Sequence, residues 1–428
     1  MKRRQFTQTA VGSALAAQLG GTLAWSQQKQ SGKQSSSSST NTGHESFLLP
    51  ISPRVKETSI IALADEGVAA IYGSVLAGDN SKILMKVSAD RGRTWSDAEP
   101  IRTKPPYGNQ VTGSRVSPVR LKSGAIGIIY TGPRVRRGRD GTLWFSKSTD
   151  EGKTWLEPTA IDPYFAVLNN DNARVLRSGR ILAPVFHWIS PFSGGDSEHE
   201  DNNLCYCWVY YSDDEGQTWN RSLSELIVSK NQGRDGIYHF EEAVAEETKK
   251  DGHLIMYGRT ELGRQYISTS QDGGVVWTQP RPGPLASSYA RTQLKRIPQT
   301  GDLLAIWSQA STEEIIAGVQ RCRLSCAISK DDGVTWEHFR NLESLDDTTR
   351  IEPPPAEPIT VYRMETFAYR QPVDRRRYHR APGAVRVSYA SVAFIGDEVL
   401  ITYDFSNNNS SQHGTKLRIL PVQWFYEA

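Results

Sequence analysis

One eight-residue pattern, Ser-x-Asp-x-Gly-x-Thr-Trp, recurs along the 428-residue chain. Its copies occupy residues 88–95, 148–155, 212–219, 270–277 and 329–336, and the fourth copy is degraded to SQDGGVVW. The aspartates at 90, 150, 214, 272 and 331 are therefore 60, 64, 58 and 59 residues apart. Five copies at nearly even spacing cannot each be an active site, so they mark a repeated structural unit. A period near sixty residues suits one four-stranded blade with its loops.

The residues of the pattern suit a hairpin turn better than a catalytic or metal site. An Asp side chain accepts hydrogen bonds from the exposed amides of a turn, Gly permits a positive φ, and the Ser and Thr hydroxyls tie the turn further. Burial of the Trp adds roughly 1 kcal/mol or more. A calcium loop needs more oxygen ligands at alternate positions, and only residues 213–216 come near that pattern. We interpret the pattern as a turn staple.

Between the copies the chain reads as short strands that are rich in β-branched and aromatic residues and bounded by Gly, Asp and Asn. Examples are GAIGIIYT (124–131), LCYCWVYYS (204–212) and DEVLITYDF (397–405). Strands also precede the first copy and follow the last. The sequence therefore predicts an all-β fold, a six-bladed β-propeller of four-stranded antiparallel blades. Strands from both ends of the chain should close the last blade, which removes open sheet edges.

The start of the chain differs in kind from the rest. Residues 1–24 combine a twin arginine with a mildly apolar stretch of small residues, which is typical of a Tat-type export signal. The alternative is a disordered basic tail. Residues 25–46 are polar and Ser-rich, cannot bury a core, and are predicted to be a flexible linker. Residues 47–428 then form the propeller, and the expected location is periplasmic or extracellular.

Charge and cysteine content exclude several classes of partner. The chain has 50 Lys and Arg against 47 Asp and Glu, a net charge of +3 that provides no strong field for nucleic acid or a membrane surface. No segment after residue 46 is long and apolar enough to span a bilayer. The four cysteines, Cys205, Cys207, Cys322 and Cys326, lack metal-site spacing, so buried free thiols are expected.

The repeated pattern is that of the Asp-box, or BNR, repeat, and the chain resembles a bacterial exo-α-sialidase of the sialidase (neuraminidase) superfamily. The resemblance extends over roughly residues 50–425 and includes the segments LNNDNARVLRSGRILAPV (168–185) and GRTELGRQYISTSQDGGVVW (258–277). The repeats are specific for the fold but are poor evidence for activity, because non-enzymatic propellers carry them too.

The resemblance implies a defined set of catalytic groups. Sialidases hold the sugar carboxylate with three arginines, attack with a tyrosine that a glutamate assists, and use an aspartate as acid/base. A tyrosine suits this reaction because an anionic nucleophile would be repelled by the carboxylate on the reacting carbon. Arginine offers a planar fork for bidentate carboxylate binding. The implied reaction is retaining hydrolysis of terminal sialic acid, without a metal or another cofactor.

Three arginines are candidates for binding the carboxylate. Arg54, in SPRVKETSIIAL, partly matches the family's first-blade RIP motif, and a surface arginine is the alternative. Arg259 ends the strand LIMYGR, where the family places its second arginine. Arg321 is expected to be the third from its spacing to the fifth repeat, with Arg323 and Arg296 as alternatives.

The resemblance also implies three catalytic residues. Asp79, in LAGDN, falls where the acid/base is expected, although the segment also reads as an ordinary turn. Glu241 or Glu242, in YHFEEAVAEE, should assist the nucleophile, and counting back from Val244 selects Glu241. Tyr389, in VSYASVAF, is the expected nucleophile, with a buried core tyrosine as the alternative.

Four further residues of the family-like segments, Asn170, Asp171, His187 and Trp188, receive no role beyond possible substrate contact. The expected partners are sialylated or other acidic glycans, and the expected state is a monomer. Two other functions stay open: a hydrolase or lyase acting on another acidic sugar such as a uronate, and a non-catalytic glycan-binding propeller. A sialidase requires the arginines to meet near the central axis and Tyr389 to reach the assisting glutamate.

Overall fold

The computed structural model describes most of one compact unit, Gly43–Ala428. The described residues are 44–74, 82–103, 111, 113–132, 142–189, 204–229, 236–311, 314, 321–344, 350–352, 385–407 and 412–427. The predicted export signal (1–24), nearly all of the predicted linker and Asp79 lie outside them. The first strand, β1 (Glu45–Leu48), begins two residues before the predicted start of the propeller at residue 47.

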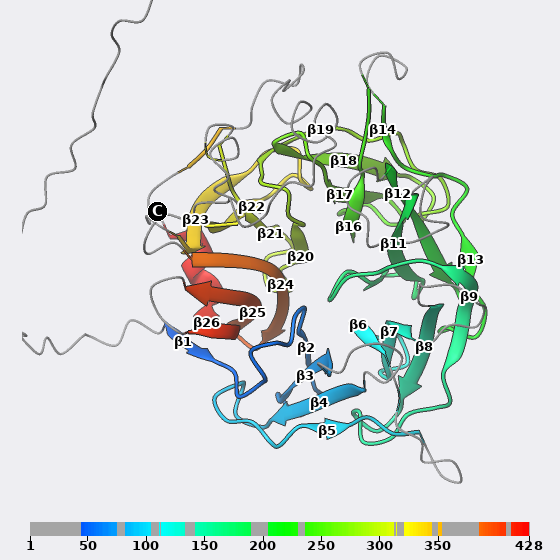
Figure 1. Cartoon of the computed structure of the whole chain (residues 1–428), viewed down its shortest axis with the longest axis vertical. Helices are drawn as coiled ribbons and strands as arrows, with labels where there is room; N and C mark the ends of the chain where they lie inside the picture. Colours follow the sequence, from blue (N-terminus) through cyan, green and yellow to red (C-terminus); the bar gives the residue numbers. More distant parts are fainter. Residues whose placement is uncertain are drawn as a thin grey trace, which may run out of the picture. The chain divides into compact units, whose positions relative to one another are not determined.

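Six sheets of four antiparallel strands are arranged as the blades of a β-propeller (Figure 1), which confirms the predicted fold class. Blade 1 consists of β2 (Ser59–Ala62), β3 (Val68–Gly73), β4 (Ile83–Ser88) and β5 (Glu99–Pro100). Blade 2 consists of β6 (Ser114–Arg120), β7 (Ile126–Gly132), β8 (Thr142–Ser148) and β9 (Thr159–Phe165). Blade 3 consists of β10 (Arg174–Val175), β11 (Ile181–Ile189), β12 (Leu204–Ser212) and β13 (Asn220–Arg221).

The remaining blades follow in chain order around the ring. Blade 4 consists of β16 (Glu241–Glu247), β17 (Leu254–Arg259), β18 (Arg264–Ser270) and β19 (Arg281–Ala286). Blade 5 consists of β20 (Gln293–Arg296), β21 (Leu303–Ser308), β22 (Leu324–Ser329) and β23 (Glu337–Glu343). Blade 6 consists of β24 (Val385–Ile395), β25 (Glu398–Asn407), β26 (His413–Pro421) and β1. A short ribbon of β14 (Val228–Ser229) and β15 (Ile237–Tyr238) and a 3-10 helix, η5 (Val422–Tyr426), complete the described elements.

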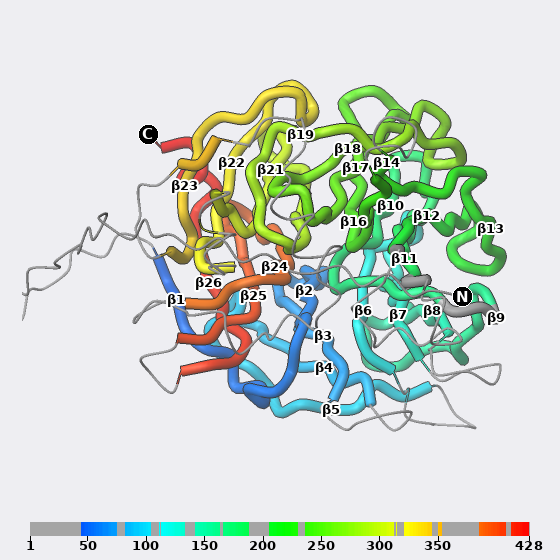
Figure 2. The backbone as a smooth tube through the Cα atoms, turned by 45° about the horizontal axis from the view of Figure 1, so that its top comes forward, coloured from blue at the N-terminus to red at the C-terminus, as the bar shows by residue number. Residues whose placement is uncertain are grey.

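Blade 6 is closed by strands from both ends of the propeller, as predicted. β1 pairs antiparallel with β26, with Glu45 opposite Ile419. In Figures 1 and 2 the first strands of the blades, β2, β6, β16 and β24 among them, surround one central space. Residues at the start of these strands therefore come together although they are far apart in the sequence.

The repeated pattern forms the predicted turn staple, between the third and fourth strands of a blade. In the fifth copy, Asp331 Oδ1 accepts hydrogen bonds from the Ser329 hydroxyl and the Thr335 amide, both at 2.8 Å. Oδ2 accepts one from the Thr335 hydroxyl at 2.6 Å. The fourth copy has Val276 in place of the threonine, so Asp272 accepts from the Ser270 hydroxyl and the Val276 amide but lacks the second hydroxyl donor.

Each staple also packs against the preceding blade. Gly333, at φ 88°, lies so close to blade 4 that a Cβ atom would sit 2.8 Å from the Ile255 side chain. The Trp336 indole donates to the Tyr257 hydroxyl at 3.0 Å, and that hydroxyl donates to the Gly333 carbonyl at 3.0 Å. Buried apolar clusters fill the space between neighbouring blades, such as the one joining Ile71 and Ile128 of blades 1 and 2.

The cysteines lie in the interior of the propeller. All four cysteines are buried and free, as predicted. Within the described ranges, no helix is long and apolar enough to cross a membrane, and no group of three or more His, Cys, Asp or Glu residues could hold a metal ion.

Candidate active site

Five blades place a non-glycine residue with left-handed backbone within their first strand or up to three residues before it. These residues, which we call the axial ring, are Glu57 (φ 60°), Arg115 (φ 50°), Asp171 (φ 46°), Glu242 (φ 48°) and Tyr389 (φ 59°). Such a conformation costs of order 1–3 kcal/mol per residue and persists only where the surroundings impose it. All five residues can ionise, so this end of the blades concentrates both backbone strain and titratable groups.

Three members of the axial ring lie in β-bulges. The register of the first two strands shifts between Ser114 and Ser117, between Glu241 and Val244, and between Ser388 and Ser391. A bulge inserts one extra residue into a strand and re-aims its side chain. Arg115, Glu242 and Tyr389 are therefore turned away from the regular alternation of their strands.

Tyr389 and Glu242 form a hydrogen-bonded couple. The Tyr389 hydroxyl donates to Glu242 Oε1 at 3.1 Å, and both residues come from bulges, in blades 6 and 4, which flank blade 5. Burial raises the pKa of Tyr389, and the Glu242 carboxylate raises it further, whereas Arg321 and Arg259 act in the opposite direction. Tyr389 is only half-buried, so it is not the core tyrosine that the sequence left as an alternative.

Glu241 is not the partner of Tyr389, in contrast to the choice made by counting back from Val244. Its fully buried carboxylate accepts hydrogen bonds from Arg259, from the Tyr289 hydroxyl and from the Cys205 thiol. Burial alone would raise the pKa of Glu241, but Arg259 and His239 lower it well below its usual value. The bulge at Glu242 explains the difference, because counting along a regular strand assigns the neighbouring residue to the wrong face.

Arg259 lies between the two glutamates. Register places it opposite Glu241, and its Nη2 is 2.7 Å from Glu241 Oε1 while Nη1 is 2.6 Å from Glu242 Oε2. Burial disfavours the charged form of Arg259, yet the two carboxylates raise its pKa above the ordinary value. Its guanidinium carbon also lies 3.8 Å from the centre of the Tyr289 ring.

Of the three arginines considered in blade 5, Arg321 lies beside Tyr389. Its guanidinium carbon is 5.3 Å from the centre of the Tyr389 ring, and it donates to the Tyr289 carbonyl at 3.0 Å. Arg323 pairs instead with Glu314 at 3.1 Å. Arg296 pairs with Asp332 at 2.8 Å, on the staple at the opposite end of blade 5.

The remaining expected arginine, Arg54, is exposed, and its backbone amide lies 3.5 Å from the Ser52 hydroxyl oxygen. No described contact joins Arg54 to Tyr389. The axial position of blade 1 is occupied by Glu57, three residues later. Asp79, the expected acid/base, lies outside the described residues.

A third arginine near the couple comes from blade 2. Arg115 is half-exposed, its Nε lies 3.7 Å from Glu57 Oε1, and it interacts electrostatically with Tyr389 and Glu242. Burial works against its charge, but these acidic neighbours raise its pKa. No sequence signal marks Arg115, because its position depends on a bulge that spacing along the chain does not reveal.

Asn170 and Asp171 form hydrogen bonds with β24, the strand that carries Tyr389. The Asn170 amide donates to the Tyr389 carbonyl at 3.0 Å. Asp171 accepts hydrogen bonds from the Ser391 hydroxyl and the Val392 amide, both at 2.9 Å. Asn170 and Asp171 are almost completely buried, so their role is to hold the bulge of β24. His187, on β11, packs against Tyr206, and nothing is described of the Trp188 side chain.

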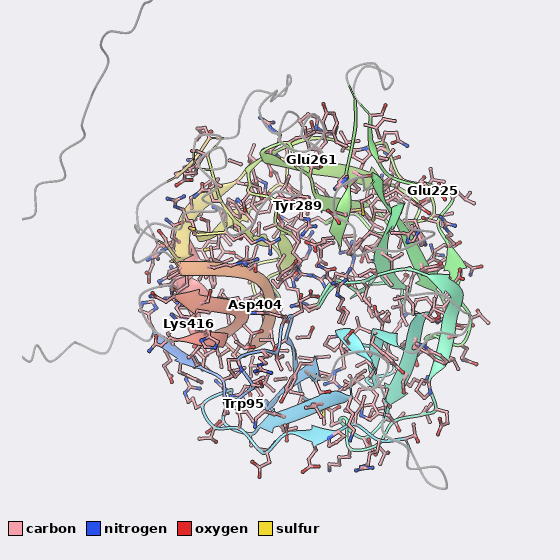
Figure 3. All side chains as sticks on the ribbon, in the orientation of Figure 1. Trp95, Glu225, Glu261, Tyr289, Asp404 and Lys416 are labelled. Atoms are coloured by element: carbon pink, nitrogen blue, oxygen red, sulfur yellow. The ribbon has the colours of Figure 1, made fainter. Side chains whose placement is uncertain are left out.

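Other ionisable groups surround this centre. His239 Nδ1 lies 2.9 Å from the Tyr289 hydroxyl. Asp404 accepts a hydrogen bond from the Glu57 amide at 3.1 Å, and burial raises its pKa to about 7. Figure 3 shows Asp404 closer to the middle of the ring than Lys416 on the neighbouring strand β26. Spacing alone gave none of these residues a role.

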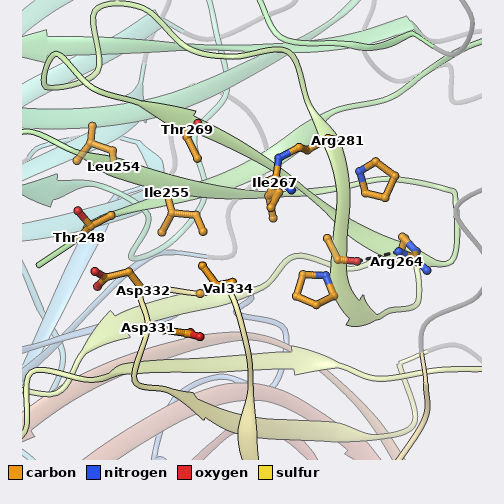
Figure 4. Close-up of a pocket in the computed structure, with 14 residues that line it drawn as sticks. Thr248, Leu254, Ile255, Arg264, Ile267, Thr269, Arg281, Asp331, Asp332 and Val334 are labelled. Carbon is orange, nitrogen blue, oxygen red and sulfur yellow. Dashed lines mark hydrogen bonds between the residues drawn. The ribbon is translucent and has the colours of Figure 1, made fainter. Parts of the chain in front are cut away.

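A cavity of about 420 Å³ lies away from the axial ring. It is formed between blade 4 and the fifth staple, with Arg264 and Arg281 on one side and Asp331 and Asp332 on the other (Figure 4). None of the axial-ring residues lines it, so the Tyr389 couple is the better candidate site.

Comparison with known proteins gives the family. Residues 119–401 match the model of the BNR repeat-like domain, which is well over half of the chain. The chain belongs to the BNR repeat-like family. The sialidase-like propeller that the sequence indicated is thereby confirmed at the level of the fold.

Solved structures resemble this BNR repeat-like propeller at low identity. A Dyadobacter fermentans protein of unknown function superposes with a TM-score of 0.58 at 16% identity, covering 89% of this chain and 99% of its own. The Hadza microbial sialidase Hz136 gives 0.56 at 17%, covering 86% and 66%. The Trypanosoma rangeli sialidase in complex with sialic acid gives 0.53 at 14%, covering 87% and 55%. The chain thus spans about two thirds and about half of these two sialidases, and such likeness shows the fold alone.

The axial ring of this BNR repeat-like propeller has a defined chemical capacity. Arg115, Arg259 and Arg321 surround a phenol whose hydroxyl is bonded to a carboxylate. Guanidinium groups bind carboxylates in planar, bidentate geometry. A phenol paired with a carboxylate base is an activatable nucleophile. The site can therefore hold an anionic ligand against a nucleophilic oxygen.

Proposed function

We propose that this protein is an exo-α-sialidase, a retaining glycoside hydrolase that releases terminal sialic acid or a related acidic sugar from glycans. The observation that carries the proposal is the hydrogen bond of 3.1 Å between the Tyr389 hydroxyl and Glu242, with Arg259 and Arg321 around it. Glycosidases that act on sugars with a carboxylate at the reacting carbon are the known exceptions that use a tyrosine nucleophile.

Each group has a physical role in the proposed reaction. Arg115 and Arg321, both partly exposed, bind the sugar carboxylate, and Arg259 holds Glu242 in place and adds positive charge. Tyr389 attacks the anomeric carbon while its proton passes to Glu242. Arg115 thus takes the role that the sequence suggested for Arg54. The Tyr389 oxygen loses its proton as its bond to the anomeric carbon forms, so no free phenolate faces the substrate carboxylate.

Export and oligomeric state are also proposals. The twin arginine and the small apolar residues of segment 1–24 support transport to the periplasm or the medium, where glycans are accessible. We propose that the protein acts as a monomer, because every residue of the proposed site comes from one ring of blades. Detection of the protein outside the cytoplasm, and its loss from there when both arginines are replaced by lysine, would test the route.

One observation favours a second function, a lyase acting on a uronate-containing polysaccharide. The His239 imidazole and the Tyr289 hydroxyl are 2.9 Å apart and lie beside Arg259. Such a pair can remove a proton from the carbon next to a carboxylate that an arginine neutralises. This reaction would not need the couple of Tyr389 and Glu242, so the presence of that couple supports the hydrolase.

The experiment that tests the proposal is release of a fluorogenic aglycone from an α-sialoside. We expect activity in the wild type and its loss in Tyr389→Phe, which keeps the ring but lacks the nucleophile. Tyr426→Phe is the matched control, because the Tyr426 hydroxyl bonds to Thr300 and Asp302 away from the axial ring. A fluorinated sialosyl fluoride should label Tyr389, as identified by mass spectrometry of its peptide.

Two results would overturn the sialidase assignment. The first is full activity of Tyr389→Phe on the sialoside. The second is an inactive wild type that instead produces an unsaturated, ultraviolet-absorbing product from a uronate polysaccharide, which would establish the lyase.

A further inference from the structure

Glu57 is a carboxylate of the axial ring to which the proposed mechanism has so far given no role. It belongs to blade 1, between Tyr389 of blade 6 and Arg115 of blade 2. The first strands of blades 1 and 6, β2 and β24, are in direct contact. Glu57 is close enough to Tyr389 to raise the pKa of its phenol, and Glu242 is close enough to Glu57 to raise the pKa of the Glu57 carboxyl.

The carboxylate of Glu57 is not fully satisfied. Its Oε1 lies 3.7 Å from Arg115 Nε, which is an ion pair without a short hydrogen bond. Its Oε2 is buried and has no hydrogen-bond partner among the described residues, although Glu57 is only 8% exposed. An unmade hydrogen bond at a buried polar atom costs about 1–3 kcal/mol. A proton on this oxygen, or a ligand oxygen beside it, would remove that cost.

The backbone fixes the place of Glu57. Its φ of 60° is strained for a residue with a side chain, and its amide donates to Asp404 Oδ1 at 3.1 Å. The next residue, Thr58, is held by the hydroxyls of Thr415 and Thr402 at 3.0 and 3.2 Å. Glycine would adopt this conformation without strain. The chain has a glutamate there instead, held in position on both sides.

The surroundings of Glu57 favour its protonated form. Burial raises the pKa of Glu57 and the nearby Glu242 carboxylate raises it further, whereas Arg115, Arg291 and the Asn170 backbone amide only partly oppose them. A general acid must hold its proton near the working pH, and carboxyls in glycosidases reach this state through burial and acidic neighbours. The opposite case is Glu241, whose pKa is lowered by Arg259 and His239.

We propose that Glu57 is the acid/base residue of the sialidase reaction, a role that rests on the function proposed above. Glu57 gives its proton to the glycosidic oxygen as the carbon–oxygen bond to the leaving group breaks. At the same time Tyr389 Oη bonds to the anomeric carbon and its proton passes to Glu242. In the second half, water bonds to that carbon, its proton passes to Glu57, and the departing Tyr389 recovers its proton from Glu242. Every proton and bond is accounted for without another reactant.

The test compares two variants, Glu57→Gln and Asp79→Asn. Asp79 is the residue that the resemblance implies as the acid/base. Both variants and the wild type are assayed on α-sialosides whose leaving groups range from an activated phenol to an unactivated sugar. A lost general acid matters most where the leaving group is poor. We expect Glu57→Gln to lose about 10²–10⁴-fold in kcat/KM on the sugar leaving group but about tenfold or less on the activated phenol.

A second variant, Glu57→Ala, gives a readout that a structural role would not change. The space left by the side chain should admit azide, so added azide should restore turnover of the activated substrate and yield sialyl azide of retained configuration. Glu225→Gln is the control for the loss of a glutamate as such. Glu225 is an exposed carboxylate on blade 3 that pairs with Arg221. Thermal unfolding of each variant reports whether it has folded.

The outcomes separate this inference from the proposed function. If the wild type releases nothing from any sialoside, the sialidase assignment falls, and this role of Glu57 falls with it. If the wild type is active but Glu57→Gln loses the same factor on every leaving group, only the role of Glu57 is overturned. A leaving-group dependence found in Asp79→Asn and absent from Glu57→Gln would likewise assign the acid/base to Asp79.

Discussion

Arg259 stands between two glutamates that are neighbours in the chain, and their different surroundings give them different tasks. Glu241 is surrounded by donors from Arg259, Tyr289 and Cys205, so it is a fixed anion. Glu242 shares Arg259 but keeps one oxygen for the Tyr389 hydroxyl. In the proposed mechanism, charge fixation by Glu241 and proton transfer by Glu242 are thus divided between adjacent residues.

This division predicts contrasting effects of two matched substitutions. Glu242→Gln should lower kcat by about 10²–10⁴-fold, because the proton acceptor is lost, and should lower stability less than Glu241→Gln does, because Arg259 keeps its pair with Glu241. Glu241→Gln should lower the free energy of unfolding by about 3 kcal/mol, because it breaks a fully buried ion pair. Steady-state kinetics and urea unfolding of both variants check this. A larger kcat loss in Glu241→Gln than in Glu242→Gln would contradict it.

Asp404 predicts a pH effect on stability. Its folded pKa of about 7 lies above the ordinary aspartate value of 3.8, so between these limits the folded state binds more protons than the unfolded state. Its contribution to the free energy of unfolding is therefore present at low pH and lost as pH rises towards 7, by at most about 4 kcal/mol. Asp404→Asn should be less pH-sensitive than the wild type in this window. If the melting temperatures of the two proteins change with pH by the same amount between pH 4 and 7, the effect is refuted.

At the scale of elements, the β-bulges decide what the sequence could and could not predict. Arg259 ends β17 and Arg321 lies three residues before β22, so the strand pattern located them beside the couple. Arg115 and Glu242 depend on bulges, and one inserted residue reverses which side chain faces the axis. Spacing in a single sequence does not show where such a residue is inserted. It therefore could not distinguish Glu242 from Glu241.

Asn170 holds the bulge that carries Tyr389 by a hydrogen bond to the Tyr389 carbonyl. We therefore expect a substitution of Asn170 to affect catalysis. Asn170→Asp removes the amide donor to the Tyr389 carbonyl and should lower kcat by about tenfold to a hundredfold, since small displacements of a reacting group are costly. Asn170→Gln, which keeps an amide, should retain more of the activity. Asn220→Asp, on the exposed strand β13, is the control. Equal kcat in Asn170→Asp and the wild type at equal melting temperature would count against this role.

At the scale of the whole molecule, the fold was predictable because its signal is local and repeated. Each staple needs only eight consecutive residues, as Asp331 shows, and the spacing of five staples gives the size of a blade. Every staple packs on the preceding blade, so each staple also stabilises the contact between two blades of the ring. The site could not be predicted to the same degree, because its residues come from different blades.

The degraded fourth staple predicts a stabilising substitution. Val276→Thr would give Asp272 the hydroxyl donor that the other four copies have, at an exposed position where the backbone already has the required geometry. The expected gain is about 0.5–1.5 kcal/mol in the free energy of unfolding, with sialoside turnover unchanged. Val276→Ser adds a hydroxyl without a β-branched side chain, and Val276→Ala has neither. Together they separate the effect of the hydroxyl on stability from the effect of removing the valine methyl groups. A gain in Val276→Ala equal to that in Val276→Thr would show that the hydroxyl is not the cause.

Blade 6 carries Tyr389 on β24 and also contains the pairing of β1 with β26, which joins residues as far apart as Glu45 and Ile419. Of the described strands, β26 emerges last during synthesis, so this sheet is the last of the six described sheets to be completed. The proposed nucleophile therefore reaches its place opposite Glu242 only when the ring is complete. A nascent chain, or a chain truncated before β26, would have no catalytic activity. The appearance of turnover during refolding would therefore report closure of the ring.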